Sequence, residues 1–108
     1  MASTAVTIPF YATAFSKEDL RAALEQIGTL SLRYGAKSWH LLQSHDDLYK
    51  FIFIVEFETK AEWEAYWYGE DFQSMRASCS GWYQVPLLYN WNDFVSGSLA
   101  PATNGVSA

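Results

Sequence analysis

The stretch 48–66, LYKFIFIVEFETKAEWEAY, decides the fold, because its hydrophobic period changes within it from that of a strand to that of a helix. Aromatic and branched residues alternate with other types from Leu48 to Glu58, which predicts a strand. Ile52 and Ile54 keep the second face apolar as well, so we expect an inner strand that is covered on both faces.

A helix follows this strand directly. Thr59 and Glu62 have the spacing of a capping box, which predicts the helix start, and Gly81 predicts its end. Gly69 interrupts the segment, so we expect two consecutive helical pieces. The alternating residues from Trp82 to Trp91 then predict a last strand.

The beginning of the chain carries another strand and helix. Ala5–Ala14 alternates and predicts the first strand, in which Pro9 favours an edge position or a bulge because it has no N–H donor. Apolar residues at helical spacing predict an amphipathic helix from Ser16 to Gly35. Ser16 and Asp19 form a second capping-box pair at its start.

Lys37–Ser44 predicts the remaining strand, which pairs with the strand 48–58 through a polar turn at His45–Asp47. The order β-α-β-β-α-β is the ferredoxin-like pattern, an α+β fold with two helices on one face of a four-stranded antiparallel sheet. The other sheet face is apolar and has no cover, so we expect a homodimer that packs sheet to sheet. We expect one domain over residues 1–95 and a flexible tail over residues 96–108.

Composition excludes several classes of partner. The 108 residues carry a formal net charge of -5, and the seven Lys and Arg residues are scattered, which argues against nucleic acid and against an anionic membrane surface. Cys79 is the sole cysteine, so no intramolecular disulfide can form. The sequence has neither a secretory signal nor an apolar run long enough for a bilayer, and we expect a cytoplasmic protein.

Residues Val55–Tyr66, VEFETKAEWEAY, followed by Asp71–Arg76, DFQSMR, resemble the strand-then-helix region of antibiotic-biosynthesis-monooxygenase proteins. The resemblance implies a dimeric α/β barrel over about residues 5–93. Members of that superfamily include cofactor-free monooxygenases of polyketide-derived aromatics, haem-degrading enzymes, and small cyclases and isomerases. Haem-degrading members bind iron through a helix-borne His, and Lys60–Gly81 contains none, so no cofactor is expected.

The candidate substrate-binding residues are mostly aromatic. Trp63, Tyr66 and Trp67 share one face of the predicted second helix, and Phe72 follows them. Asn90, which is polar, lies late in the predicted last strand. The aromatic residues either pack the core or form a cavity wall that stacks against a flat aromatic substrate. The sequence leaves both interpretations open.

Two side chains are candidates for catalysis. Arg76 could stabilise a phenolate, or it could pair with Glu70 or Asp71 at the surface. His40 could be a general base if it faces the helices, or it could be a partly buried structural residue. No H-x-x-x-H or H-x-H spacing occurs, and His45–Asp47 is better explained as a solvated turn, so no metal site is expected.

Together with the resemblance, these residues suggest a small cofactor-independent monooxygenase of secondary metabolism that acts on an aromatic or polyketide-like substrate. A cyclase or isomerase of the same fold, using His40 and a tyrosine as acid and base, is one alternative. A non-catalytic ligand-binding or assembly protein, whose aromatic residues serve packing and dimerisation, is the other.

Overall fold

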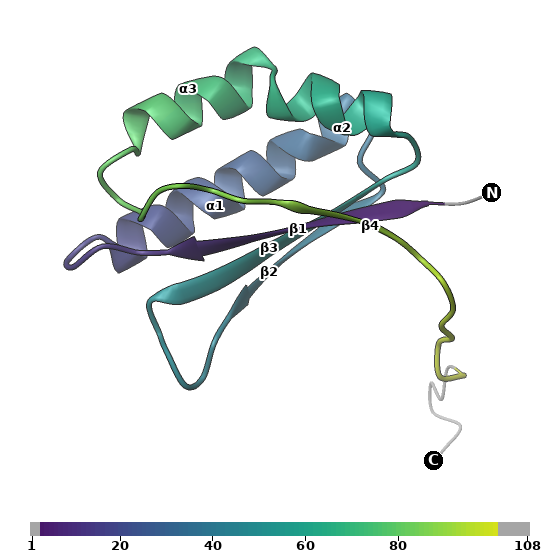
Figure 1. Ribbon diagram of the computed structural model, residues 1–108, viewed down its shortest axis with the longest axis horizontal. Helices are drawn as coiled ribbons and strands as arrows, with labels where there is room; N and C mark the ends of the chain where they lie inside the picture. Colours follow the sequence, from purple (N-terminus) through teal and green to yellow (C-terminus); the bar gives the residue numbers. More distant parts are fainter. Residues whose placement is uncertain (1–2, 102–108) are drawn as a thin grey trace.

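The chain forms an antiparallel sheet with its helices on one face (Figure 1). The computed structural model describes residues 3–101. Its elements in chain order are β1 Thr4–Tyr11, α1 Lys17–Ser31, the 3₁₀ helix η1 Leu32–Tyr34, β2 Ser38–Gln43, β3 Lys50–Phe57, α2 Lys60–Trp67, α3 Glu70–Ser78 and β4 Asn90–Asp93. The strands follow the order β2-β3-β1-β4, which confirms the predicted ferredoxin-like α+β fold.

The centre of the sheet is the pair formed by β1 and β3. The two strands run antiparallel, with Thr4 opposite Phe57 at one end and Tyr11 opposite Lys50 at the other. Every second side chain of both strands is buried under the helices, and these residues form the floor of the core: Val6, Ile8, Phe10, Phe51, Phe53, Val55 and Phe57. The prediction that β3 is an inner strand is confirmed.

β1 is an inner strand as well, so the edge position that Pro9 suggested is wrong for the strand as a whole. An inner strand tolerates Pro9 here because the neighbour of β1 on the side away from β3 is short: β4 pairs only with Thr4–Thr7. Tyr11 accepts a backbone bond from Gln84 on that side, so by strand alternation the nitrogen of Pro9 points there too. Pro9 has no paired residue on the β4 side, so its missing N–H interrupts no ladder hydrogen bond.

The last strand is much shorter than the predicted Trp82–Trp91. Only Asn90–Asp93 is a regular strand, and residues 82–89 are irregular apart from an isolated bridge between Ala12 and Tyr83. Pro86 lies in the middle of this segment and has no N–H donor for a ladder. Alternation of side chains was therefore not matched by backbone pairing.

One of the two predicted capping boxes is present. The Thr59 hydroxyl accepts a bond from the Glu62 N–H at 3.2 Å, and the Glu62 carboxylate accepts one from the Thr59 N–H. Ser16 precedes α1 but makes no side-chain cap bond, so the capping box with Asp19 is wrong. Gly35 ends the 3₁₀ turn in the left-handed region, with φ of 99°.

The sheet face opposite the helices, called here the open face, has no cover within residues 3–101. Its apolar side chains are half-buried or exposed, among them Ala5, Pro9, Tyr11, Leu42, Ile52 and Ile54. Residues 96–101 form neither helix nor strand, and the rest of the predicted tail, residues 102–108, lies outside the described residues. In the described part of the chain no helix has the length and apolarity to cross a bilayer.

α1 packs on β2 through a glycine. A Cβ atom built on Gly28 would lie 2.4 Å from Cε3 of Trp39, much closer than any real contact of that kind. The absence of a side chain at Gly28 is therefore what allows the indole ring to lie flush against the helix.

We expect Gly28→Ala to lower the free energy of unfolding by about 1–3 kcal/mol, because the rigid Trp39 ring must move to admit the methyl group. Gly81→Ala is the matched control, since its Cβ would meet no atom within 4 Å. Urea unfolding of both variants measures the difference. Equal midpoints would contradict the packing role of Gly28.

Candidate functional site

The predicted aromatic residues come together between α2, α3 and the sheet. We call Trp63, Tyr66, Trp67, Phe72, Phe57 and Tyr89 the aromatic cluster. Its rings meet edge-on, tilted or stacked at centroid distances from 4.9 to 6.2 Å. Such arrangements are the favourable ones for ring quadrupoles. The cluster joins two helices and a strand into one core.

These rings fill their own space. Trp63, Tyr66 and Phe72 have no exposed surface, and Trp67 keeps 9%. The Tyr66 hydroxyl donates to the carbonyl of Ile27, which ties α2 to α1, and burial raises the pKa of this phenol well above its ordinary value. Core packing, one of the two interpretations that the sequence left open, therefore describes the single chain. The role of these residues in substrate binding stays a prediction.

Arg76 projects from α3 onto the aromatic cluster. Its guanidinium carbon lies 4.0 Å from the centroid of Trp67 and 5.0 Å from that of Phe72, which is cation–π geometry. Nη2 donates to the Trp67 carbonyl at 2.9 Å, whereas Nη1 is buried and has no acceptor in the described part of the chain. Burial lowers the pKa of this group, because desolvation disfavours its charged form.

Neither acidic neighbour neutralises this arginine. Among residues 3–101, no ion pair joins Arg76 to Glu70 or Asp71. Asp71 instead accepts a bond from the Tyr34 hydroxyl at 2.8 Å, and this bond raises the pKa of Tyr34. The alternative of a surface ion pair is therefore wrong for this structure.

A second buried donor lies beside the same ring. Nε1 of Trp63 is buried and has no acceptor within residues 3–101. The Trp63 ring stacks on Trp67 at 5.2 Å between centroids, so Trp67 is the common neighbour of the two unsatisfied donors. Buried N–H groups without partners are rare in proteins, because each forfeits its hydration. Among the described residues, these two N–H groups are the buried side-chain polar atoms that have no hydrogen-bond partner.

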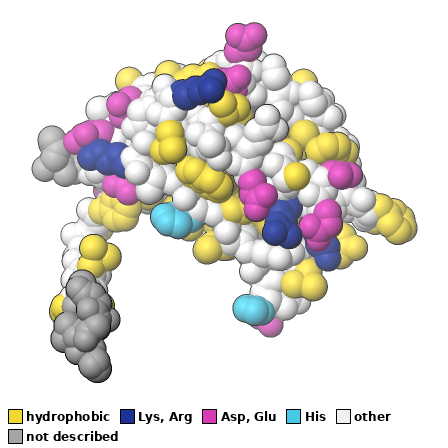
Figure 2. All heavy atoms as spheres, turned by 180° about the vertical axis from the view of Figure 1, so that it is seen from behind, with side chains coloured by type: hydrophobic (Ala, Val, Ile, Leu, Met, Phe, Trp, Pro, Cys, Tyr) yellow, Lys and Arg dark blue, Asp and Glu magenta, His cyan; other side chains and the backbone are white. Residues whose placement is uncertain are grey.

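His40 does not lie with Arg76. Trp39 packs toward α1, so by alternation along β2 the next side chain, His40, points to the open face, where it is exposed. The condition for its role as a base, an orientation toward the helices, is not met. The two histidines of the chain lie well apart on the surface (Figure 2). Asn90 is exposed opposite Thr7 on the same open face, away from the aromatic cluster.

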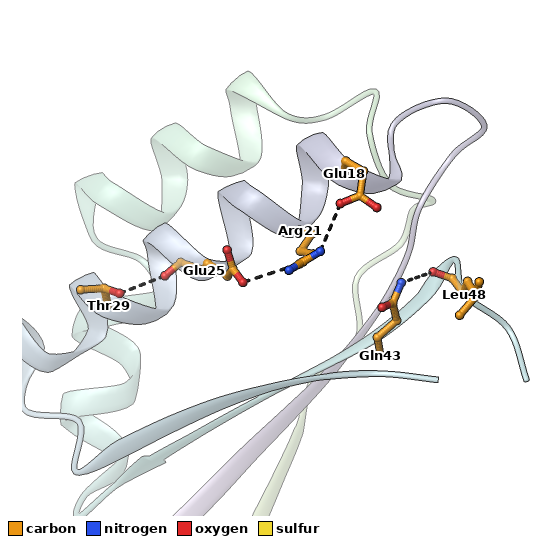
Figure 3. A network of polar contacts seen from close by, with 6 residues as sticks. All are labelled: Glu18, Arg21, Glu25, Thr29, Gln43 and Leu48. Atoms are coloured by element: carbon orange, nitrogen blue, oxygen red, sulfur yellow. Dashed lines mark hydrogen bonds and ion pairs between the residues drawn. The ribbon is translucent and has the colours of Figure 1, made fainter. Parts of the chain in front are cut away.

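A hollow of about 500 Å³ runs along the free side of β2, and polar groups surround it. Its lining combines residues of α1, β2 and β3: Arg21, Glu25, Trp39, His40, Leu41, Gln43 and Phe51. Arg21 forms ion pairs along α1 with Glu18 at 3.3 Å and with Glu25 at 3.6 Å (Figure 3). The Gln43 side-chain amide donates a hydrogen bond to the Leu48 carbonyl. Arg21 is therefore already neutralised within its own helix.

The sequence did not indicate the groove between α1 and α3. It has a volume of about 490 Å³ and an apolar floor with small residues along both walls: Ala22, Ala23, Ile27, Leu30, Ser74, Met75, Ser78, Cys79 and Trp82. Asp19 and Asp71 lie at its rim, and burial raises the pKa of Cys79. The spacing of Ala22 and Ala23 against Ser74 and Ser78 on two helices was the signal that could have revealed it.

Within residues 3–101 no group of three or more His, Cys, Asp or Glu side chains is placed to hold a metal ion. No protein-family profile and no curated protein matches the sequence.

Solved structures match the fold over almost the whole chain. A candidate antibiotic biosynthesis monooxygenase from Nitrosomonas europaea has 19% sequence identity and a TM-score of 0.74, over 92% of both chains. Another, from Bordetella bronchiseptica, has 17% identity and a TM-score of 0.78, over 89% of this chain and 100% of its own.

The protein NE2512 of unknown function, from Nitrosomonas europaea, has 16% identity and a TM-score of 0.76, over 94% of this chain and 98% of its own. The neighbours thus include proteins with an assigned reaction class and proteins without one. The chain has the ferredoxin-like fold of the antibiotic biosynthesis monooxygenases.

Proposed function

We propose that this protein is a small cofactor-independent monooxygenase that acts on an aromatic or polyketide-like substrate bound at the aromatic cluster. The two buried donors without acceptors, Nε1 of Trp63 and Nη1 of Arg76, carry the proposal. A phenolate or quinone oxygen is an acceptor that would satisfy such donors. The shared fold with candidate monooxygenases supports the same reaction class.

Tyr89 occupies the place that a flat substrate would take. Its ring lies edge-on to Trp63 at 5.0 Å and to Trp67 at 5.2 Å. It belongs to the irregular segment 82–89, whose backbone bonds to residues 11–13 lie at its start, at Trp82 and Gln84. Displacement of Tyr89 would open the faces of both indole rings without breaking the sheet, and a substrate ring would restore the contacts that Tyr89 gives up.

The chemistry requires no redox cofactor if the substrate supplies the electrons. A phenol with a free ring position gives up four electrons to O₂; one oxygen atom becomes the second quinone carbonyl and the other leaves as water. The reaction begins from the phenolate, whose charge the Arg76 guanidinium would stabilise in dry surroundings. The aromatic cluster would exclude water from the reactive anion.

Oxygen uptake with a panel of dihydroxy-aromatic compounds tests this function. We expect uptake with the wild-type chain and a fall in kcat/KM of about 10²–10³-fold for Arg76→Met, the usual effect of removing one anion-stabilising donor. Arg33→Met is the matched control, because Arg33 is exposed on η1 and should leave the rate unchanged. The absence of uptake with every compound that binds the protein would contradict the proposal.

A ligand-binding or assembly protein is the second candidate, and the complete burial of Trp63, Tyr66 and Phe72 favours it. A filled core needs no ligand to explain its aromatic residues. Tryptophan fluorescence that changes on adding an aromatic compound, with no oxygen consumed, would select this candidate over the monooxygenase.

For either function we propose a homodimer formed through the open face. Ile52 and Ile54 lie at its centre, Leu42 is 48% exposed and Tyr11 39% exposed beside them. An apolar sheet face of this kind is stable in water when a second sheet covers it, at a spacing of about 10 Å.

We expect Ile54→Lys to convert the dimer to a monomer, because it places a charge in the middle of the apolar contact. Leu32→Lys is the control, since Leu32 is 52% exposed on η1, on the helix side of the molecule. Sedimentation velocity reports both masses. A wild-type chain that sediments as a monomer at all concentrations would remove the dimer from the proposal.

A further inference from the structure

The groove between α1 and α3 lies apart from the aromatic cluster, and no residue of that cluster lines it. The two helices lie next to each other on the same side of the sheet (Figure 1). Each helix contributes one stripe of residues at helical spacing, between positions 19 and 30 on α1 and between positions 71 and 78 on α3. The volume of about 490 Å³ is that of a small-molecule site.

Contacts between the helices fix the two ends of the groove. The Thr13 N–H bonds to the Trp82 carbonyl at 2.9 Å, which holds the segment after α3 beside the turn before α1. At the other end Tyr34, just after α1, donates its hydroxyl to Asp71 at the start of α3, at 2.8 Å. The helices are therefore antiparallel, and Asp19 and Asp71 lie at opposite ends of the groove.

The rise of an α-helix gives the span between these ends. At about 1.5 Å per residue, the stripe on α3 covers about 10 Å and the stripe on α1 about 16 Å. Between the two carboxylates the described lining carries no charged side chain, and most of it is apolar. The groove thus has the form of an apolar channel with one acidic group at each end.

Both acidic groups lack a cation. Within residues 3–101, neither Asp19 nor Asp71 forms an ion pair, and no described residue of the lining is Lys, Arg or His. Each carboxylate lies in the first turn of its helix, where the dipole supplies only about half a positive charge, so both ends stay net negative.

Each carboxylate also has an aromatic side chain at its end of the groove. Trp82 lines the end at which α1 begins, and Tyr34 is bound directly to Asp71. A carboxylate accepts several hydrogen bonds, so the Tyr34 hydroxyl leaves Asp71 with acceptor capacity for a further donor. Aromatic rings beside negative charge are a typical environment for organic ammonium groups.

We infer that the groove binds a linear aliphatic dication, a diamine or polyamine, with one ammonium group at Asp19 and the other at Asp71. The methylene chain lies along the apolar floor between the helices, where it loses its contact with water. The ammonium groups donate charge-assisted bonds to the two carboxylates, beside the rings of Trp82 and Tyr34. The site is independent of the proposed oxygenase reaction.

Isothermal titration calorimetry of the full-length chain with octanediamine tests this site. We expect Asp19→Asn and Asp71→Asn each to weaken binding about fivefold, because each variant removes one ion pair. Glu18→Gln and Glu70→Gln are the matched controls. They remove a carboxylate from the same first turns, so they have the same effect on the helix dipole, but neither residue lines the groove and binding should not change.

Two related compounds separate a dication site from a merely apolar groove. Octylamine has the same methylene chain with one ammonium group and should bind about fivefold more weakly than octanediamine. Octanol should bind more weakly still. Equal affinities for octanol and octanediamine, or equal affinities of the wild type and both Asn variants for octanediamine, would overturn the inference. So would the absence of octanediamine binding to the folded wild-type chain.

A steric variant places the ligand in the groove without a change of charge. Ala22→Phe should abolish the binding of octanediamine, because the new ring occupies the groove. Ala77→Phe is the control, since Ala77 is exposed on α3 and does not line the groove. Thermal unfolding shows that both variants are folded. Unchanged binding by folded Ala22→Phe would overturn the assignment of the dication to this groove.

Discussion

The antiparallel pairing of β1 with β3 is the constraint on which the other features of the molecule depend. Its register, with Val6 opposite Val55 and Ile8 opposite Phe53, places the large apolar side chains of both strands on the helix side. A shift of one residue would turn all of them to the open face. The same register therefore fixes both the floor on which the aromatic cluster packs and the apolar face that is left without cover.

Much of the fold could be predicted because periodicity reports burial. β3 was identified as an inner strand from its two apolar faces, and α2 from the Thr59 and Glu62 box, which forms with both of its bonds. The strand predicted over residues 82–89 is absent. The side chains of this segment alternate, but Pro86 and the short β4 leave its backbone without ladder hydrogen bonds. The capping box predicted at Ser16 is absent for a related reason. A sequence shows which side chain could cap α1, but not which conformation that side chain adopts.

The site was predictable in part. The sequence placed Trp63, Tyr66 and Trp67 on one helix face, and the structure gathers them with Phe72 as one cluster. It could not place His40, because the face to which a strand residue points depends on register against the other strands. In the structure, Trp39 lies against Gly28 on the helix side, which leaves His40 on the open face, and no local sequence pattern reveals this contact.

Arg76 is the residue that packing alone does not explain. A guanidinium under aromatic rings loses hydration, and its contacts with Trp67 and Phe72 and one carbonyl bond replace only part of it. An aliphatic side chain would fill the same space without leaving Nη1 buried and without an acceptor in the described residues. Tyr89 packs edge-on against Trp67, on which the Arg76 guanidinium lies, and it immediately precedes β4. The four residues of β4 in turn pair with β1, so the backbone connects this ring directly to the sheet.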